Sequence, residues 1–249
     1  MRLLFLDVET SPIQAYVWSL FNNHSISVDQ VIVPTSILCW AAKWCGQPEI
    51  MFAKAQKPDS PEFARMMKKI HTLLSECDAV CHFNGNSFDL PRLNTEFLRL
   101  GMEPPPPCPS IDLLRVVQSK FSMTSNKLAF VSPYLKIGSK VKNAGWDLWK
   151  DCLAGDAVAW GKMEAYNKQD TFLLEKLYKK VLPWIDQHPN MNMLTDSGKP
   201  VCPNCGDAKL QSRGIYRTVT QEYTRYCCTA CGRWSRARKA SKRAAVEVR

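Results

Sequence analysis

The chain of 249 residues lacks any long hydrophobic run. The apolar residues at its start meet an acid at Asp7, and the longest other apolar run, residues 37–42, ends at Lys43. A membrane-spanning helix needs about 20 consecutive apolar residues, so neither segment is long enough to be one. Neither has the form of a signal peptide. We therefore expect a cytoplasmic protein without membrane contact.

Histidine is scarce, and repetition is missing. The four histidines have no metal-ligand spacing, and we find no internal repeat and no low-complexity tract. With 45% hydrophobic and 22% charged residues, the composition is typical of a globular protein rather than a disordered one. The length allows one large domain, or one medium domain with a small appendage.

The formal net charge of +10 is concentrated in one part of the chain. From Lys199 onward, 12 Lys and Arg residues stand against three acids, whereas the 198 residues before it contain 21 basic and 20 acidic residues. A basic C-terminal part favours a polyanionic partner. A solvated basic segment without a specific partner is the alternative.

Five of the eleven cysteines lie close together in the same basic part. The other six are scattered among apolar residues, where a free thiol packs as a small hydrophobic group. The clustered cysteines include two Cys-x-x-Cys-Gly motifs, Cys202 with Cys205 and Cys228 with Cys231, separated by 22 residues. Four thiolates at such a spacing bind one structural Zn²⁺. Cys227 is a rival to Cys228, but only Cys228 keeps the two-residue spacing to Cys231.

The segment between the cysteine pairs suits a β-hairpin, so residues 200–240 resemble a zinc ribbon. A piece of about forty residues buries too little core to fold without its metal. Its arginines are interleaved with Tyr216, Tyr223, Tyr226 and Trp234, which favours nucleic-acid binding. Contacts with replication or repair proteins are the alternative. We predict a linker at residues 187–199 and a basic tail at 241–249.

The rest of the chain alternates between strand and helix patterns. Strands are predicted at residues 2–8, 37–44, 49–54 and 78–83, the second and third as a hairpin. Helices are predicted at about 61–77, after the cap Ser60, at 90–100 and at 162–180, and residues 111–160 are predicted as mainly helical with loops. This alternation predicts an α/β or α+β domain built on one sheet.

Two carboxylates, Asp7 and Glu9, end the first predicted strand. Residues two apart on a strand point to the same face, so these side chains are predicted neighbours. Paired carboxylates repel one another unless a cation neutralises them, which favours a divalent metal site. Alone, the pair is a weak signal.

Two later motifs supply further acids. Asp89 lies where a strand passes through a glycine turn into a helix, and taken alone it suits a helix cap equally well. Tyr166 and Asp170 are four residues apart on the last long helix and share one face. Asp170 borders an apolar stripe, where it is either a buried acid with a partner or a half-exposed acid at the margin.

Together, the order, spacing and context of the three motifs resemble the DEDD superfamily of 3′–5′ exonucleases. Tyr166 in the third motif points to the tyrosine (DEDDy) subgroup. The second motif, Asn84-x-x-x-Phe88-Asp89, is most similar to the proofreading domain of family B DNA polymerases and its stand-alone relatives in phages and prokaryotes. The resemblance covers about residues 1–185. It implies a ribonuclease H-like mixed sheet flanked by helices over residues 1–186, in the cytosol of a prokaryote or a phage-infected host.

The resemblance also implies hydrolysis of phosphodiester bonds with two Mg²⁺ or Mn²⁺ ions. Two such ions about 3.5–4 Å apart lower the pKa of water and stabilise the leaving oxygen, and hard cations call for carboxylate ligands. Asp7 would bridge both ions, with Glu9 and Asp170 completing one site. Asp89 would serve the second ion, and Tyr166 would orient the attacking water.

Four residues are assigned to the substrate. Thr10 would hydrogen-bond the terminal sugar, and Asn84 would contact the terminal nucleotide. Phe88 would contact the same nucleotide or belong to the core, and Lys127 would meet a phosphate or be solvated. Six tryptophans are assigned to packing: Trp18, Trp40, Trp44, Trp146, Trp149 and Trp160.

The leading hypothesis is therefore a metal-dependent 3′–5′ exonuclease with a zinc ribbon that assists substrate binding. DNA is favoured, as a single-stranded or frayed 3′ end. An RNA 3′-end-processing exonuclease would use the same carboxylates. Two further hypotheses are a non-catalytic nucleic-acid-binding protein on an exonuclease fold and a structure-specific endonuclease.

Overall fold

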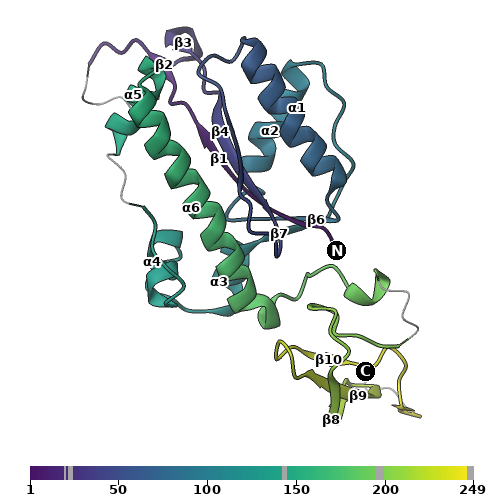
Figure 1. The fold of residues 1–249 in the computed structure, drawn as a ribbon. Helices are drawn as coiled ribbons and strands as arrows, with labels where there is room; N and C mark the ends of the chain where they lie inside the picture. Colours follow the sequence, from purple (N-terminus) through teal and green to yellow (C-terminus); the bar gives the residue numbers. More distant parts are fainter. Residues whose placement is uncertain (20, 22–24, 142–144, 195–198, 246–249) are drawn as a thin grey trace. The chain divides into compact units, whose positions relative to one another are not determined.

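The structure, a computed structural model, describes residues 1–19, 21, 25–141, 145–194 and 199–245 (Figure 1). The chain divides into two compact units. The larger consists of Arg2–Gln118 and Ser122–Leu177, and the smaller of Met1, Ser119–Phe121 and Tyr178–Arg249. Parts of the predicted linker and tail, residues 195–198 and 246–249, lie outside the described residues. Within the described ranges, no helix combines the length and apolarity that a membrane span requires.

A five-stranded mixed sheet is the centre of the larger unit. Its strand order is β5 (Met51–Lys54), β4 (Ile37–Trp44), β1 (Leu3–Thr10), β6 (Ala79–His82) and β7 (Ser110–Asp112). β1 pairs antiparallel with β4 and parallel with β6, β7 is parallel to β6, and β4 and β5 form the predicted hairpin. A separate two-stranded ribbon joins β2 (Gln14–Ala15) to β3 (Val31–Val33), next to a 3₁₀ turn at Val28–Gln30. The predicted mixed sheet with flanking helices is confirmed.

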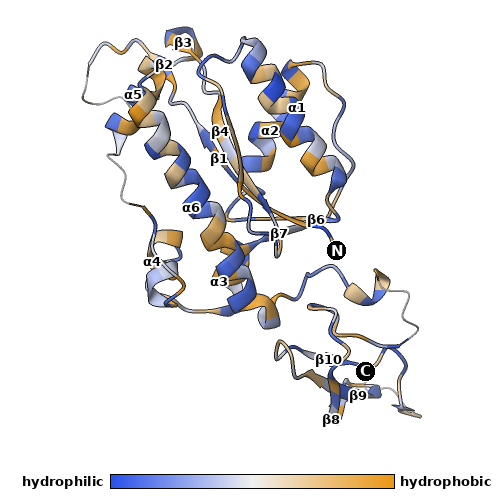
Figure 2. Cartoon of the chain, in the orientation of Figure 1, coloured by the Kyte–Doolittle hydropathy of each residue, from blue (hydrophilic) through white to orange (hydrophobic). Residues whose placement is uncertain are grey.

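Helices cover both faces of this sheet. Figure 1 shows α1 (Pro61–Glu76) and α2 (Asp89–Arg99) on one side and α6 (Ala157–Val181) on the other. Alternate residues of β1, Leu4, Leu6 and Val8, are buried with α1 and α2 in one core. Because strand side chains alternate, the odd-numbered residues that end in Asp7 and Glu9 point to the opposite face. Figure 2 shows apolar residues along β4, which is buried over nearly its whole length.

The start of α1 follows the predicted capping pattern. The Ser60 side chain accepts a hydrogen bond from the Phe63 N–H, and Pro61 occupies the first turn. All six apolar residues at helical spacing are buried: Phe63, Met66, Met67, Ile70, Leu73 and Leu74. This helix is therefore fixed by local signals in the sequence, which explains why its limits were predictable.

Other boundaries were predicted wrongly. Residues 110–112 form the strand β7, which the sequence did not predict, because pairing with β6 outweighs the weak signal of three residues. The region after it contains α3 (Leu113–Lys120), α4 (Leu128–Tyr134) and α5 (Trp146–Ala154), in agreement with a mainly helical region with loops. α6 begins at Ala157, five residues before the predicted start, because the Asp156 side chain accepts hydrogen bonds from the Val158 and Ala159 N–H groups.

The assignment of six tryptophans to packing is wrong for two of them. Trp18 is 99% exposed and Trp146 is 64% exposed. Trp40 and Trp160 are buried as predicted, and Trp44 and Trp149 are partly buried against core clusters. A single aromatic residue in a loop carries no periodicity, so its burial is not readable from its neighbours.

The smaller unit is built around one β-hairpin. β8 (Leu210–Arg217) pairs with β9 (Gln221–Cys228), and β10 (Trp234–Arg236) and β11 (Lys242–Arg243) also pair with β9, all antiparallel. Two 3₁₀ turns, Leu182–Trp184 and Met191–Met193, precede the hairpin. The predicted zinc-ribbon fold is confirmed.

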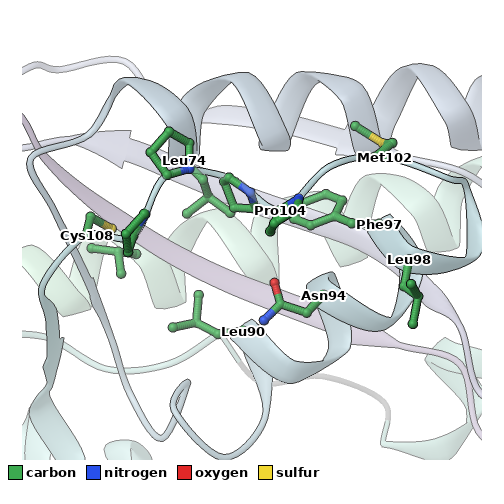
Figure 3. Close-up of a pocket in the computed structure, with 12 residues that line it drawn as sticks. Leu74, Leu90, Asn94, Phe97, Leu98, Met102, Pro104 and Cys108 are labelled. Atoms are coloured by element: carbon green, nitrogen blue, oxygen red, sulfur yellow. The ribbon is translucent and has the colours of Figure 1, made fainter.

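A cavity of about 420 Å³ opens between α1, α2 and the proline-rich segment 104–107 (Figure 3). Its lining contains no carboxylate and no cation, and Asn94 is one of its few polar residues. Hydrolytic chemistry that needs acids or metal ions cannot take place there. The acids of the three motifs lie elsewhere.

Candidate active site

The structure brings three of the predicted acids together on the α6 side of the sheet. Asp7 and Glu9 at the end of β1 and Asp170 on α6 place one carboxylate oxygen each within 4.8 Å of one another. They are separated by up to 163 positions in sequence, since Asp7 and Asp170 stand at opposite ends of the larger unit's chain. The fold, rather than local sequence, therefore creates this cluster.

Asp89 joins the cluster through the backbone of β1. β6 pairs with β1 only as far as Phe5, so the Val8 N–H has no partner on that strand. The Asp89 side chain accepts this N–H, with an Oδ1 to nitrogen distance of 2.9 Å. Asp89 is the first residue of α2 and Phe88 is its N-cap, so Asp89 is not the N-cap, although it lies in the first helical turn, where an acid is favoured. Asp89 is thereby attached to β1 between Asp7 and Glu9 in sequence, whereas the three-carboxylate cluster itself consists of Asp7, Glu9 and Asp170.

A row of polar contacts along α6 holds Asp170 in position. Asn167, Thr171 and Glu175 are successive residues four apart on one face of the helix. Asn167 donates to the Asp7 carboxylate at 2.6 Å, and Thr171 donates to the carbonyl of Ala41 at 3.3 Å. Glu175 forms a buried ion pair with Lys43 at 2.5 Å. These contacts fix the rotation of α6 on the sheet, and with it the direction of Asp170.

Asn167 was missed by the sequence reasoning. Its side chain is buried and touches Asp7 twice, through the carboxylate and through the main-chain carbonyl at 3.2 Å. A signal was present, because Asn167 lies four residues after Met163 on the apolar stripe of the helix, where an amide is costly unless it has a partner. Its role is to orient the Asp7 carboxylate.

Burial and mutual repulsion raise the pKa values of the acids. Burial, followed by the charges of Glu9, Asp89 and Asp170, holds the pKa of Asp7 well above its usual range. Burial also raises the pKa of Glu9 to about 8 and that of Asp89 to about 7. Burial raises the pKa of Asp170 in the same direction, against the opposing charge of Lys140. A neighbouring positive charge would therefore stabilise the ionised form of these acids.

Lys140 supplies one such positive charge, beside Asp170. No sequence motif identified this lysine. Its Nζ lies 2.6 Å from Asp170 Oδ2 and 3.3 Å from the Tyr166 hydroxyl. Burial lowers the pKa of Lys140, but the charge and hydrogen bond of Asp170 outweigh burial and hold that pKa above its usual range. In the sequence, Lys140 is one of several lysines in a loop, so only the folded structure identifies it.

The acid cluster also fits divalent metal ions. The buried Asp170 Oδ1 has no hydrogen-bond partner among the described residues. An unsatisfied carboxylate oxygen beside two further carboxylates is the donor set that Mg²⁺ and Mn²⁺ prefer. Asp7, Glu9 and Asp170 are therefore able to hold such an ion.

Tyr166 lies one helical turn before Asp170, at the edge of the cluster. Its ring packs edge-on against Trp149, with 6.1 Å between ring centroids. Burial and the neighbouring acids raise the pKa of Tyr166 further above its usual range. Its hydroxyl therefore stays protonated at neutral pH and can act as a hydrogen-bond donor.

The four predicted substrate residues are not all in one place. Asn84 and Lys127 line the same groove of about 620 Å³, together with Lys140. Thr10 and Phe88 are not part of its lining. The Thr10 carbonyl accepts the Trp149 ring N–H, and Phe88 is half-buried with Arg92 over its ring, so Phe88 is not a core residue.

A buried hydrogen-bond network shapes the turn that leads to Asp89. The Gly85 N–H donates to His82 Nδ1 at 2.9 Å, and the other ring nitrogen lies 2.7 Å from the Ser110 hydroxyl, which donates to Asn86 Oδ1. Burial lowers the pKa of His82 to about 4, so the ring is neutral, as this chain of donors requires. The turn itself includes Asn84 at a φ of 70°.

We expect Gly85→Ala to lower activity and stability because of this network. A Cβ at position 85 would lie 2.3 Å from the His82 ring, so the ring or the turn must move. A forced shift of this kind costs about 1–3 kcal/mol. The matched control is Gly161→Ala in α6, where the new Cβ has no atom within 4 Å among the described residues, apart from its chain neighbours and the helix's own backbone. Removing a helical glycine should stabilise the protein by roughly 0.5–1 kcal/mol. Urea unfolding would measure both, and equal effects would contradict the packing argument.

The raised pKa values also predict a pH dependence of stability. The ordinary pKa of a glutamate such as Glu9 is 4.5, and below that pH the Glu9 carboxyl is protonated in both the folded and the unfolded chain. Between this pH and about pH 8, only the folded chain keeps the Glu9 proton. Stability without Mg²⁺ or Mn²⁺ should therefore fall as pH rises from about 5 to 8. Saturating Mn²⁺ should abolish or reverse this slope. Thermal unfolding across this range, with zinc kept in the buffer, tests it, and identical slopes with and without Mn²⁺ would contradict it.

A second ligand cluster lies in the smaller unit. The Sγ atoms of Cys202, Cys205, Cys228 and Cys231 lie within 4.8 Å of one another. Gly206 and Gly232, the residues after each pair, have φ values of 76° and 82°, which glycine adopts without strain. Their N–H groups donate to the carbonyls of Cys202 and Cys228 at 2.9 and 2.8 Å, closing both turns. This tetrad can hold one metal ion, and Cys227 is not part of it.

Known proteins resemble this chain in two respects, its sequence family and its fold. A family model for the RNase H superfamily matches residues 35–182. The fold is similar to that of the family B DNA polymerase from the hyperthermophilic archaeon Pyrobaculum calidifontis, with a TM-score of 0.54 and 17% sequence identity. That match covers 73% of this chain but 24% of the polymerase, so the chain spans about a quarter of that protein's length. No curated protein sequence matches.

Proposed function

Because the chain belongs to the RNase H superfamily, we propose that it is a metal-dependent 3′–5′ exonuclease that hydrolyses phosphodiester bonds at nucleic-acid 3′ ends. The observation that carries this proposal is the meeting of Asp7, Glu9 and Asp170, with Asp89 bound to the backbone of β1 beside them. Their order along the chain and the presence of Tyr166 support the tyrosine subgroup of exonucleases. DNA is the favoured substrate, because the second motif is similar to that of DNA polymerases.

Asp7, Glu9, Asp89 and Asp170 would hold two Mg²⁺ or Mn²⁺ ions. When bound, such ions supply a hydroxide nucleophile near neutral pH and offset charge on the leaving 3′ oxygen. Asn167 keeps Asp7 oriented toward the site, and the protonated Tyr166 would position the attacking water. Asn84 and Lys127 would contact the polynucleotide in the groove that they line.

The domain limits follow from the same proposal. Residues 1–186 would form the exonuclease domain, 187–199 a linker, 200–240 the zinc ribbon and 241–249 a basic tail. The four cysteines would hold one structural Zn²⁺, and the ribbon would assist substrate binding with its basic surface. Contacts of the ribbon with replication or repair proteins are compatible with the same fold.

End-labelled strands test the proposed reaction. Single-stranded DNA and RNA, each labelled at the 3′ or the 5′ end, are offered to the protein with Mg²⁺, Mn²⁺ or no added metal. We expect the 3′ label to be released first as mononucleotide and the 5′ label to pass through a stepwise series of shorter products. Internal cuts would make the protein an endonuclease, and preference for RNA would change the substrate. Binding without cleavage under every condition would leave a nucleic-acid-binding protein.

A further inference from the structure

One face of the ribbon sheet consists of arginines stacked on aromatic rings. On β9, Tyr223 and Arg225 are two residues apart and point to the same face. The strand register places Tyr216 of β8 opposite Tyr223, and Arg236 of β10 opposite Arg225. Trp234, two residues before Arg236, shares this face as well. These five residues are called the arginine–aromatic face below.

The side chains of this face contact one another in two stacks. The Arg225 guanidinium lies 4.8 Å from the Trp234 ring centroid. The Arg236 guanidinium lies 3.8 Å from the ring centroid of Tyr223 and 5.6 Å from that of Tyr216. Trp234 remains 47% exposed and Tyr216 45% exposed. Large parts of both rings are therefore open to a further flat partner.

The charges on the two faces of the sheet differ. Arg217 and Glu222 are paired residues of β8 and β9 that lie on the opposite face and form an ion pair at 2.8 Å. Among the described residues, neither Arg225 nor Arg236 is paired with a carboxylate; their contacts are rings and, for Arg225, the Arg213 carbonyl. The arginine–aromatic face thus carries uncompensated positive charge beside exposed rings.

We infer that this face binds single-stranded nucleic acid, with bases stacked on Trp234 and Tyr216 and phosphates paired with Arg225 and Arg236. Unpaired guanidiniums suit phosphate, and exposed rings suit bases that are not stacked in a duplex. A duplex would hide those base faces, so single strands should be preferred. The inference rests on the proposed function and deepens it, because it names the surface of the ribbon that binds nucleic acid and states that this surface binds single strands.

Binding is measured separately from cleavage, in the full-length Asp7→Ala variant. Fluorescence anisotropy follows labelled oligothymidylate, oligouridylate and a DNA duplex over a range of salt concentrations. We expect Trp234→Leu with Tyr216→Leu to weaken binding to both single strands by roughly tenfold or more, because each variant residue loses a ring on which a base can stack. Duplex binding should change less. The relative affinity of the two single strands shows whether DNA or RNA is the preferred partner.

A charge-matched pair of variants isolates the face from overall basicity. Arg225→Gln with Arg236→Gln should weaken binding and lower the salt slope by roughly 0.7 for each lost phosphate contact. Arg238→Gln with Lys239→Gln removes the same charge from exposed residues that follow β10, and should weaken binding less. Zinc content and circular dichroism check that each variant is folded. Equal losses in both pairs, or unchanged binding in the ring variant, would overturn the inference in favour of diffuse electrostatics or a protein partner.

The outcome is distinguishable from failure of the proposed function. With the catalytic acids intact, the ring variant should hydrolyse long strands with a higher KM than the parental protein. If the parental protein cleaves nothing but binds single strands through this face, the exonuclease proposal fails and the inference stands. If cleavage is present and the ring variant binds as the parent does, the inference fails alone.

Discussion

Asp7→Asn should lower the rate of 3′-end hydrolysis by about a thousandfold or more, since metal coordination supplies several kcal/mol of transition-state stabilisation. The pKa of Asp7 is raised by burial and by the charges of Glu9, Asp89 and Asp170. Asparagine keeps the shape of the side chain and can still accept the Asn167 hydrogen bond, but it removes the negative charge that would bind a divalent cation. Asp7→Ala should be equally inactive and lose that hydrogen bond as well.

The same substitution should stabilise the metal-free protein. At neutral pH the folded metal-free chain must keep desolvated acids such as Asp7 protonated, which lowers its stability, and asparagine does not carry this cost. A loss of activity combined with a higher melting temperature would separate a functional acid from a structural one. The matched control is Asp147→Asn, an exposed acid of α5 paired with Lys150, which should change neither quantity appreciably. Substantial activity in Asp7→Asn would contradict the assignment of the metal site.

The sequence was sufficient for those parts of the site that depend on short-range periodicity. Asp7 and Glu9 share a face because strand residues alternate, and Tyr166 and Asp170 share one because helix residues four apart do. That these pairs belong together was inferred from the resemblance of their order, since no local rule joins β1 to α6. The position of Asp89 depends on an unpaired N–H of Val8, which only the lengths of the paired strands reveal.

Lys140 and the edge strand β7 were not predictable for a common reason. Each owes its position to a partner far away in the chain: Asp170 for Lys140, and β6 for residues 110–112. Neither has a periodic or capping signal of its own. Asn167 differs, because its place on an apolar stripe did mark it as a polar residue in need of a partner. Tertiary contacts thus determine the position of residues such as Lys140, whereas local sequence patterns are enough to identify the pairs Asp7 with Glu9 and Tyr166 with Asp170.

The largest expected effect on stability concerns the cysteine tetrad. Cys228→Ser should abolish zinc binding and unfold the ribbon, because a structural zinc site contributes about 10–16 kcal/mol of apparent binding free energy at neutral pH. The ribbon has little core to compensate for this loss. Most side chains of β8 are exposed, and Cys228 of β9 is one of the few buried residues of the ribbon. The first cysteine pair is attached through Asn204, whose amide donates to the carbonyls of Leu182 and Ile185 at 2.7 and 2.9 Å.

The neighbouring thiol provides a control that differs by one position. On β9, Cys227 and Cys228 point to opposite faces, and Cys227 is paired with Trp234 on the arginine–aromatic face, away from the tetrad. Cys227→Ser should therefore retain one zinc per chain and the β-sheet signal in circular dichroism, whereas Cys228→Ser loses both. Zinc content after gel filtration and melting of the ribbon would measure the difference. If Cys227→Ser lost the metal and Cys228→Ser kept it, the ligand assignment and the register of β9 would both be wrong. A strand that is shifted by one residue turns every side chain to the other face of the sheet.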